Sequence, residues 1–400
     1  MTIEKVKGFR DIFAPQSLRR EQIVRIIQDK AKLYGFMPLE TPTVEYDELL
    51  KGDNEIDEAV SDRFKLKDRG GRNLGLRFEF TVQLSRIFKE LSTIKLPWRR
   101  YQVGNVFRDE PLRPDRFREF IQCDVDIMGD PSVKADAECL ALTNAILAEL
   151  KLKADIKVNN RKLLNALLEK SGVVGDQLQV LREIDKLDKL SRADVEKNLK
   201  KIVKDDVVRN IFGFLDKDLD FFIKNKFAGA DEIAELRDLG KLYGFDIIFV
   251  PTLMRGFSYY TGNVFEVWSK DKKCALAGGG RFDDKVGKYV NRSIPAVGIS
   301  FGTLVDVDVD AADQNVEFLI ISLDQDEKSI ELTEKLRAAG CSCILFYGKP
   351  SKALEYANAY QIRQVIFVGA DEVKVKKVKV KDMVSGKEKL VSVAEIMKEK

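Results

Sequence analysis

The chain has 400 residues, of which 44% are hydrophobic and 33% charged, enough for a large core and one or two smaller domains. A formal net charge of only +3 excludes a bulk polycation, so any contact with nucleic acid must come from local basic patches. Histidine is absent, which excludes a Ser-His-Asp or Cys-His mechanism, an imidazole general base and a His-ligated metal.

The N-terminal segment and the cysteines favour a cytoplasmic location. No apolar run approaches the length of a membrane span, and the first residues lack an apolar signal core. The five cysteines are scattered and form no CxxC pair. We therefore expect reduced thiols, with no disulfide framework and no metal site built from His or Cys.

The first hundred residues are predicted to form a helix, an extended segment and a hairpin. Apolar residues recur at helical spacing in residues 15–34, and Gly35 ends this helix. The segment 38–42 is bracketed by two prolines and is expected to enter an edge strand. Two adjacent glycines within residues 68–71 predict a hairpin turn.

Residues 74–81 are interpreted as a strand that runs into a helix. Within it, Glu79 and Thr81 are two residues apart, so we expect both side chains on one side of the strand. The pair is a candidate for binding a ligand. The alternative is an exposed acidic residue and a helix-capping threonine.

Residues 99–129 predict two strands joined by a basic loop, because Pro111 and Pro114 would be rejected inside a strand. Arginine is suited to bidentate phosphate contacts, and acidic and amide groups lie among the arginines. The pattern suits a small zwitterion together with a polyphosphate, whereas a solvated charged hairpin is the simpler alternative. The arginines are Arg108, Arg113, Arg116 and Arg118, and the polar groups are Glu110, Gln122, Asp124 and Asp126.

The middle of the chain is predicted to be mostly helical. Residues 132–152 form an amphipathic helix pattern, and residues 161–241 contain several short, charge-rich amphipathic pieces. The basic run 197–204 is a candidate for phosphate contact, although such runs are more often solvated helix faces. Residues 245–251 predict a buried strand.

The last third of the chain predicts a glycine-rich strand, a linker and an α/β domain. Three consecutive glycines in residues 277–283 permit close approach of the backbone to a ligand. The acidic segment 305–315 is interpreted as a linker. In residues 316–400, strands and helices alternate, which predicts a compact domain with a mixed sheet, and residues 374–381 predict a basic strand.

Several of these stretches resemble the histidyl-tRNA synthetases, a family of class II aminoacyl-tRNA synthetases. The most specific matches are to motif 2 and to the family signature RGxxYYTGxxFE. The weaker matches are to motif 1, to a glycine-rich segment and to the start of motif 3, which the resemblance implies is a strand that feeds an ATP-site helix. The matching residues are FRDE (107–110), RFREF (116–120), QCDVD (122–126), RGFSYYTGNVFE (255–266), PLETP (38–42), AGGGRFD (277–283) and IPAVGISFG (294–302).

The resemblance implies an α+β fold: a class II catalytic core on an antiparallel sheet with a helical insertion, and a C-terminal α/β anticodon-binding-type domain. It divides the chain into the first part of the catalytic core (1–155), a mostly helical insertion (156–242), the second part of the core (243–304), an acidic linker (305–315) and the anticodon-binding-like domain (316–400).

The resemblance also implies an activity, histidine–tRNA ligase, in which ATP activates histidine as histidyl-adenylate before transfer to tRNA(His). Mg²⁺ is expected with the ATP, and a homodimer is expected. Such an enzyme needs no nucleophile of its own, so the absence of histidine is no obstacle. The family's motifs assign catalysis to Arg108 and Arg255, ATP binding to Arg108, Glu110, Arg116 and Phe120, and histidine binding to Glu79, Thr81, Gln122, Asp126, Arg255, Tyr259 and Tyr260.

The chain departs from the family at two positions. Val305 stands where motif 3 has an arginine that meets the γ-phosphate of ATP, and Ser258 stands where the signature often has an aspartate. Losing one charge-assisted phosphate contact would cost on the order of a few kcal/mol. Two alternatives therefore stay open: a non-catalytic paralogue, such as a regulatory subunit of ATP phosphoribosyltransferase, and an RNA-binding module.

Overall fold

The computed structural model describes residues 3–52, 62–91, 93–111, 116–254, 259–290, 293–308 and 316–398. The chain forms two compact units, Met1–Asp310 and Ala311–Lys400. Within the described ranges, no helix has both the length and the apolar character that crossing a bilayer requires.

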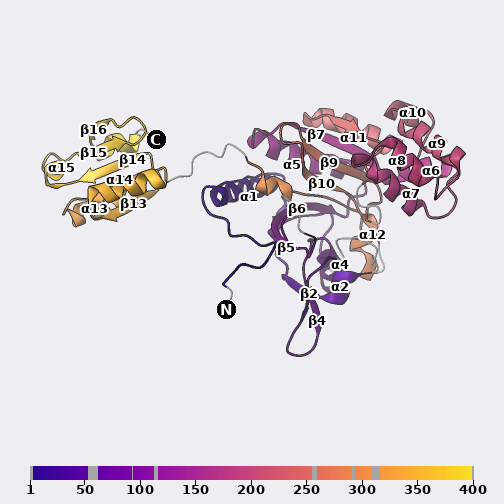
Figure 1. Ribbon diagram of the computed structural model, residues 1–400, viewed down its shortest axis with the longest axis horizontal. Helices are drawn as coiled ribbons and strands as arrows, with labels where there is room; N and C mark the ends of the chain where they lie inside the picture. The colour runs from indigo at the N-terminus through magenta and orange to yellow at the C-terminus, as the bar shows by residue number, and fades with distance from the viewer. Residues whose placement is uncertain are drawn as a thin grey trace. The chain divides into compact units, whose positions relative to one another are not determined.

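The first unit is built on an eight-stranded sheet (Figure 1), with the strand order β1-β5-β6-β11-β10-β9-β7-β8. The six inner strands are antiparallel to their neighbours, and only the edge strands β1 and β8 pair in parallel. The predicted antiparallel core is confirmed. The strands are β1 (Met37–Pro38), β5 (Trp98–Phe107), β6 (Glu119–Met128), β11 (Ala296–Ser300), β10 (Ala275–Arg281), β9 (Asn263–Ser269), β7 (Ala154–Asn160) and β8 (Ile247–Phe249).

The two faces of this sheet differ in character because side chains alternate along a strand. On β6, the odd-numbered Cys123, Val125 and Ile127 are buried in the main hydrophobic core. Helices α1 (Gln16–Leu33) and α5 (Val133–Glu149) contribute their apolar faces to the same core. Each fully buried aliphatic side chain of this kind contributes about 1.5–3 kcal/mol to folding. The even-numbered residues of β6 are left on the opposite face.

A smaller three-stranded sheet, in the order β2-β4-β3, lies in the same unit. Its hairpin confirms the turn predicted at residues 68–71, because Lys67 pairs with Asn73 across it. The elements of this part are β2 (Val44–Tyr46), α2 (Asp47–Lys51), β3 (Lys65–Lys67), β4 (Asn73–Leu76) and α4 (Val82–Glu90).

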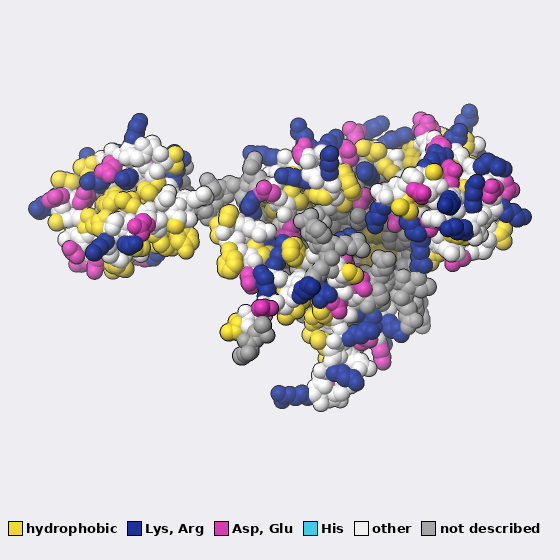
Figure 2. Space-filling model, viewed as in Figure 1, with side chains coloured by type: hydrophobic (Ala, Val, Ile, Leu, Met, Phe, Trp, Pro, Cys, Tyr) yellow, Lys and Arg dark blue, Asp and Glu magenta, His cyan; other side chains and the backbone are white. Residues whose placement is uncertain are grey.

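The middle of the chain is helical, as predicted, and begins with α6, whose N-terminus is capped by Asn160. Figure 2 shows Lys and Arg side chains interspersed with Asp and Glu over these helices. In the basic run 197–204, Lys200 ion-pairs with Asp205 at 3.3 Å, which favours the solvated-face interpretation. The elements are α6 (Arg161–Ser171), α7 (Gln177–Ile184), η1 (Asp185–Asp188), α8 (Arg192–Leu199), α9 (Asp205–Leu215), α10 (Leu219–Lys224) and α11 (Ala230–Tyr243).

The second unit has a five-stranded mixed sheet, in the order β13-β12-β14-β15-β16, which confirms the predicted α/β domain. Ile320 packs with α13 and the neighbouring Ile321 with α14, so the two helices cover opposite faces. The elements are β12 (Phe318–Ser322), α13 (Asp326–Ala338), β13 (Cys343–Tyr347), α14 (Pro350–Ala359), β14 (Gln364–Val368), α15 (Ala370–Lys374), β15 (Val378–Asp382), β16 (Glu388–Val391) and α16 (Val393–Lys398).

Two predicted strands differ from the structure. The segment 245–251 was expected to be a buried strand, but β8 is a short edge strand on which Ile248 is 44% exposed. The basic strand expected at 374–381 begins only at Val378, because the preceding residues complete α15. The local sequence pattern thus predicted both strands. It did not predict that β8 lies at the edge of the sheet, or that β15 begins at Val378.

The segment after β11 also differs from expectation. Motif 3 was expected to continue into an ATP-site helix, but only a 3₁₀ turn, η3 (Thr303–Asp306), follows. Its last residue, Asp306, ion-pairs with Arg10 and Arg20, and Val307 is buried. The start of the predicted linker therefore belongs to the first unit, and residues 309–315 lie outside the described part.

Candidate active site

One face of the large sheet gathers three of the predicted site residues, Phe120, Gln122 and Asp126, along the strand β6. Phe120, Gln122, Asp124 and Asp126 alternate along β6 and therefore point to the same side. A strand rises roughly 3.3 Å per residue, so this row spans about 20 Å from Phe120 to Asp126. The residues predicted for ATP and for histidine thus occupy successive parts of one continuous face.

A buried cation lies opposite the far end of this row. Arg100 of β5 is the direct cross-strand neighbour of Asp126 and is fully buried. Its Nη2 lies 2.6 Å from Oδ2 of Asp126, which is 3% exposed. Among the described residues, Oδ2 nevertheless receives no hydrogen bond of ordinary geometry. The carboxylate is thus neutralised but keeps an acceptor for a ligand.

Burial raises the pKa of Asp126 to about 7; the Arg100 charge opposes this, and the nearby Asp124 and Glu79 carboxylates add to it. The folded state therefore holds this proton more tightly than the unfolded chain. Protonated Asp126 therefore adds to the free energy of unfolding at low pH, and this contribution is lost as the pH rises from about 4 through about 7.

We expect this loss to amount to a few kcal/mol, on the order of the pKa difference multiplied by 1.4 kcal/mol per unit. The measurement is denaturant unfolding of the wild type and of Asp126→Asn from pH 5 to pH 8, followed by tryptophan fluorescence. Trp98 and Trp268, the two tryptophans of the chain, both belong to the large sheet. The wild type should lose stability relative to the variant as the pH rises, and parallel profiles would contradict the prediction.

Two glycines make room for Asp126 and Tyr260 side by side. Gly298 of β11 and Gly280 of β10 are paired across the sheet. A Cβ on Gly298 would overlap Oδ1 of Asp126, and one on Gly280 would lie 2.8 Å from the Tyr260 ring. The glycine run was expected to admit a ligand; at these positions it admits the chain's own side chains.

Glu79 and Thr81 lie close to Tyr259, but not on a strand as predicted. The strand β4 ends at Leu76, and Glu79 lies in the loop before α4, where it accepts the Val82 N–H at 2.6 Å. The Tyr259 hydroxyl donates to Glu79 at 3.4 Å. Burial raises the pKa of Glu79 and of Tyr259. Glu79, not Thr81, is thus the residue that caps the helix.

The residues predicted for ATP form a second group at the other end of the row. Arg108 donates from Nε to the carbonyl of Phe78 at 3.2 Å and lies over the Phe120 ring, 5.1 Å from its centroid. Glu110 accepts from Arg116 at 2.9 Å and lies 3.8 Å from Arg108. Burial lowers the pKa of Arg108, and the nearby Glu110 and Glu79 carboxylates oppose that shift. The Arg116 side chain is 60% exposed, so it is free to turn towards a polyphosphate.

Four residues named in the sequence analysis lie outside the described residues: Arg113, Pro114, Arg255 and Ser258. The assignment of Arg255 to catalysis and to histidine binding therefore stays a prediction. Val305 is described, and its side chain is 1% exposed within the main hydrophobic core. An arginine in this place would have to be buried among apolar groups.

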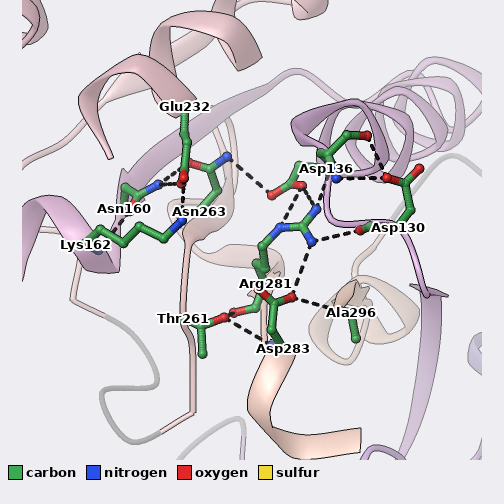
Figure 3. A network of polar contacts seen from close by, with 11 residues as sticks. Asp130, Asp136, Asn160, Lys162, Glu232, Thr261, Asn263, Arg281, Asp283 and Ala296 are labelled. Atoms are coloured by element: carbon green, nitrogen blue, oxygen red, sulfur yellow. Dashed lines mark hydrogen bonds and ion pairs between the residues drawn. The ribbon is translucent and has the colours of Figure 1, made fainter. Parts of the chain in front are cut away.

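A network of buried polar contacts holds the strand that follows Tyr260 (Figure 3). Arg281, at the end of β10, ion-pairs with Asp136 at the start of α5. Asn263 donates to Asp136 at 3.3 Å and accepts from Asn160 at 2.8 Å. The backbone N–H of Thr261 donates to the carbonyl of Arg281 at 2.7 Å. Four elements meet here, β7, β9, β10 and α5, and the network fixes the backbone immediately after Tyr260.

A cavity of about 350 Å³ opens beside Tyr259 and Tyr260, between α6 and the short helix α12 (Asp283–Val286). Its lining combines aromatic rings with side chains of both charges. The lining residues are Arg161, Asn165, Tyr259, Tyr260, Thr261, Asp284 and Lys285.

Sequence reasoning missed Arg100, and it did not give Asp124 a role. Arg100 was overlooked because its partner is 26 residues away in the chain, and only the register of the β5–β6 pair brings them together. The sequence did contain a clue. If the two strands pair about a centre at position 113, Arg100 falls opposite Asp126 and Gln102 opposite Asp124, on the same face of the sheet.

Comparison with known proteins gives consistent matches over both units. A family model described as histidyl-tRNA synthetase matches residues 8–304, and one described as an anticodon binding domain matches residues 314–399. Histidine–tRNA ligase 1 of Bacillus cereus is 34% identical, over 97% of this chain and 95% of that protein.

Two solved structures share the fold. The histidyl-tRNA synthetase from Nostoc sp. PCC 7120 superposes with a TM-score of 0.88 at 24% identity, covering 100% of this chain and 99% of that one. An ATP phosphoribosyltransferase regulatory subunit/histidyl-tRNA synthetase from Bacillus halodurans C superposes with a TM-score of 0.76 at 25% identity, covering 92% and 98%.

Proposed function

Because the chain belongs to the histidyl-tRNA synthetase family, we propose that it is a histidine–tRNA ligase that uses ATP. In the first step the histidine carboxylate attacks the α-phosphate of ATP, pyrophosphate leaves and histidyl-adenylate forms. In the second step a hydroxyl of the 3′-terminal adenosine of tRNA(His) attacks the activated carbonyl, and AMP leaves. Neither step needs a protein nucleophile, so catalysis rests on positioning and charge stabilisation.

The observation that carries the proposal is the continuous row on β6, which runs from the acidic Asp126 to Phe120, where Arg108 lies over the ring. At the acidic end, Oδ2 of Asp126 is ion-paired with Arg100 but receives no hydrogen bond among the described residues, so we assign it to a ring N–H, and Tyr260 lies next to it. An apolar isostere of histidine would leave that carboxylate buried without a partner, which selects against it. Glu79, Thr81 and Gln122 would receive the ammonium group of the substrate.

At the basic end, Arg108 and Arg116 would contact the phosphates of ATP, and Phe120 would stack on the adenine. Glu110 already accepts from Arg116, and in the complex we assign it to the adenine amino group. Arg255 is assigned to the α-phosphate and the substrate carboxylate on the family motif alone. Mg²⁺ would arrive with ATP, with the phosphates as its main ligands, since the described residues contain no group of three or more candidate metal ligands.

The C-terminal unit supports tRNA(His) as the partner, because it matches an anticodon binding domain. The homodimer implied by the family is part of the proposal. Leu33 at the end of α1 and Met37 of the edge strand β1 are 79% and 66% exposed, and a partner subunit on that edge would cover them.

One observation favours a second candidate, a non-catalytic paralogue that regulates ATP phosphoribosyltransferase. Val305 lies in the core, so the described residues of motif 3 place no cation on the ATP side. A solved structure named for both roles shares the fold of this chain. The row on β6 and the anticodon-type unit favour the ligase.

The test is histidine-dependent exchange of pyrophosphate into ATP, measured with the purified full chain. We expect exchange that requires histidine and is not supported by other amino acids. A folded protein that binds histidine and gives no exchange above background would overturn the ligase and favour the paralogue. Binding of tRNA(His) with neither histidine binding nor exchange would instead indicate an RNA-binding module.

A further inference from the structure

Asp124 is a buried carboxylate in the middle of the polar row, and the proposed function gives it no substrate contact. Its two oxygens accept from Nε2 of Gln122 at 3.0 and 3.1 Å, and both residues are 5% exposed. A carboxylate only accepts hydrogen bonds, so the amide of Gln122 must turn its NH₂ group towards Asp124. The carbonyl oxygen Oε1 then points the other way.

The other groups around Asp124 keep its carboxylate in place. Ser300 faces it from β11 and hydrogen-bonds to it. Gln102 faces it from β5 and uses its own NH₂ group on Thr41 Oγ1 at 2.8 Å. Burial raises the pKa of Asp124, and the Arg100 charge opposes that rise most strongly. Arg100 is thus a counter-charge for two carboxylates, Asp124 and Asp126.

Arg100 does not have the contacts of a structural clamp. The other buried arginine of this sheet, Arg281, donates to two carboxylates and two backbone carbonyls at the end of β10. Arg100 instead ion-pairs with Asp126 at 2.6 Å and donates to the Phe80 carbonyl at 3.2 Å and to Gln102 at 3.4 Å, and its Nε has no partner among the described residues. A buried ion pair adds little stability compared with apolar packing, so a role in arranging the site explains Arg100 better.

We infer that Asp124 is a positioning residue, whose carboxylate fixes the Gln122 amide so that Oε1 is presented to the ammonium group of the amino acid, with Arg100 as the buried counter-charge. The inference rests on the proposed function, because it takes histidine as the ligand of this face. It adds residues that act on the substrate only through the neighbours that touch it. Recognition of the ammonium group then depends on a neighbour that never contacts it.

The test compares histidine with its des-amino analogue, imidazolepropionate, by equilibrium calorimetry in the absence of ATP. The wild type should prefer histidine. Asp124→Asn keeps the shape of the side chain but adds an NH₂ donor. The Gln122 amide can then hydrogen-bond to residue 124 through either its NH₂ group or its Oε1, so its orientation is no longer fixed. We expect the preference for histidine over the analogue to fall by at least about tenfold, with the affinity for imidazolepropionate nearly unchanged.

Two further variants separate positioning from folding. Arg100→Met should lose the same preference, and Arg100→Lys should restore part of it. Arg99→Gln is the matched control, since Arg99 precedes Arg100 on β5, pairs with Glu138 at 2.6 Å and has a side chain that is 29% exposed. The control should keep the wild-type preference.

The outcomes distinguish the inference from the function on which it rests. A wild type that binds no histidine would overturn the proposed function. A wild type that binds histidine, with a folded Asp124→Asn that keeps the full preference over imidazolepropionate, would overturn only the positioning role. Loss of affinity for both ligands alike in Asp124→Asn would also overturn it, because that result indicates a purely structural residue.

Discussion

Among the described glycines, replacing Gly279 by alanine is expected to cause one of the largest losses of stability. Gly279 lies in the middle of β10, opposite Ile299 of β11. An added Cβ would overlap the carbonyl oxygen of Gly298 and lie 2.7 Å from Cα of Ile299. Both are backbone atoms in the centre of a sheet, so no side-chain rotation relieves the clash.

We expect the cost in unfolding free energy to reach or exceed about 3 kcal/mol, the upper end of the usual range for overpacked cores. The measurement is denaturant unfolding followed by tryptophan fluorescence, which reports on the large sheet. Gly213→Ala is the control, because Gly213 lies within α9 with nothing within 4 Å of the added Cβ. That change should stabilise the protein by about 0.5–1 kcal/mol. Equal midpoints for Gly279→Ala and the wild type would show that the β10–β11 register is wrong.

The largest loss of activity is expected from Asp126→Asn. The substitution keeps the shape but removes the charge that would hold a ring N–H of histidine in a buried site. It also leaves the buried Arg100 with one carboxylate neighbour fewer. We expect kcat/KM for histidine in the exchange reaction to fall about 100-fold or more, whereas the KM for ATP changes little.

Asp155→Asn is the matched control for this change. Asp155 lies on β7 of the same sheet and pairs with Lys270 at 2.9 Å, with 32% of its side chain exposed. Exposed ion pairs of this kind contribute little to the stability of the fold, so the control should retain wild-type kinetics. A histidine kcat/KM that is equally insensitive to Asp126→Asn would remove Asp126 from the site.

The elements that the sequence predicted well are those whose signals are local. The helix α1 ends at the predicted glycine, because a helical apolar stripe and Gly35 are both readable within a few residues. The β5–β6 hairpin followed from apolar runs on either side of two prolines. For β8, the same kind of apolar run gave a strand but not its position at the edge of the sheet, which depends on pairing with β7.

The residues of the candidate site likewise divide into those that local sequence predicted and those that depend on contacts between distant segments. Phe120, Gln122 and Asp126 were found from one contiguous motif, and their common face follows from strand alternation alone. Arg100 was missed, since its role depends on pairing between distant segments. The absence of the motif 3 arginine was evident from the sequence, but the burial of Val305 was not, because η3 places that residue in the core only in three dimensions.

The absence of histidine from the chain has a consequence for magnetic resonance studies of the site around Asp126. The chain contains no histidine, so any imidazole signal in a sample of the pure protein with its amino acid comes from the ligand. With a ¹⁵N-labelled ring, the two nitrogen shifts would report directly which tautomer binds and whether it is protonated. The role proposed for the Asp126 carboxylate can thus be studied against a spectrum that has no background of its own.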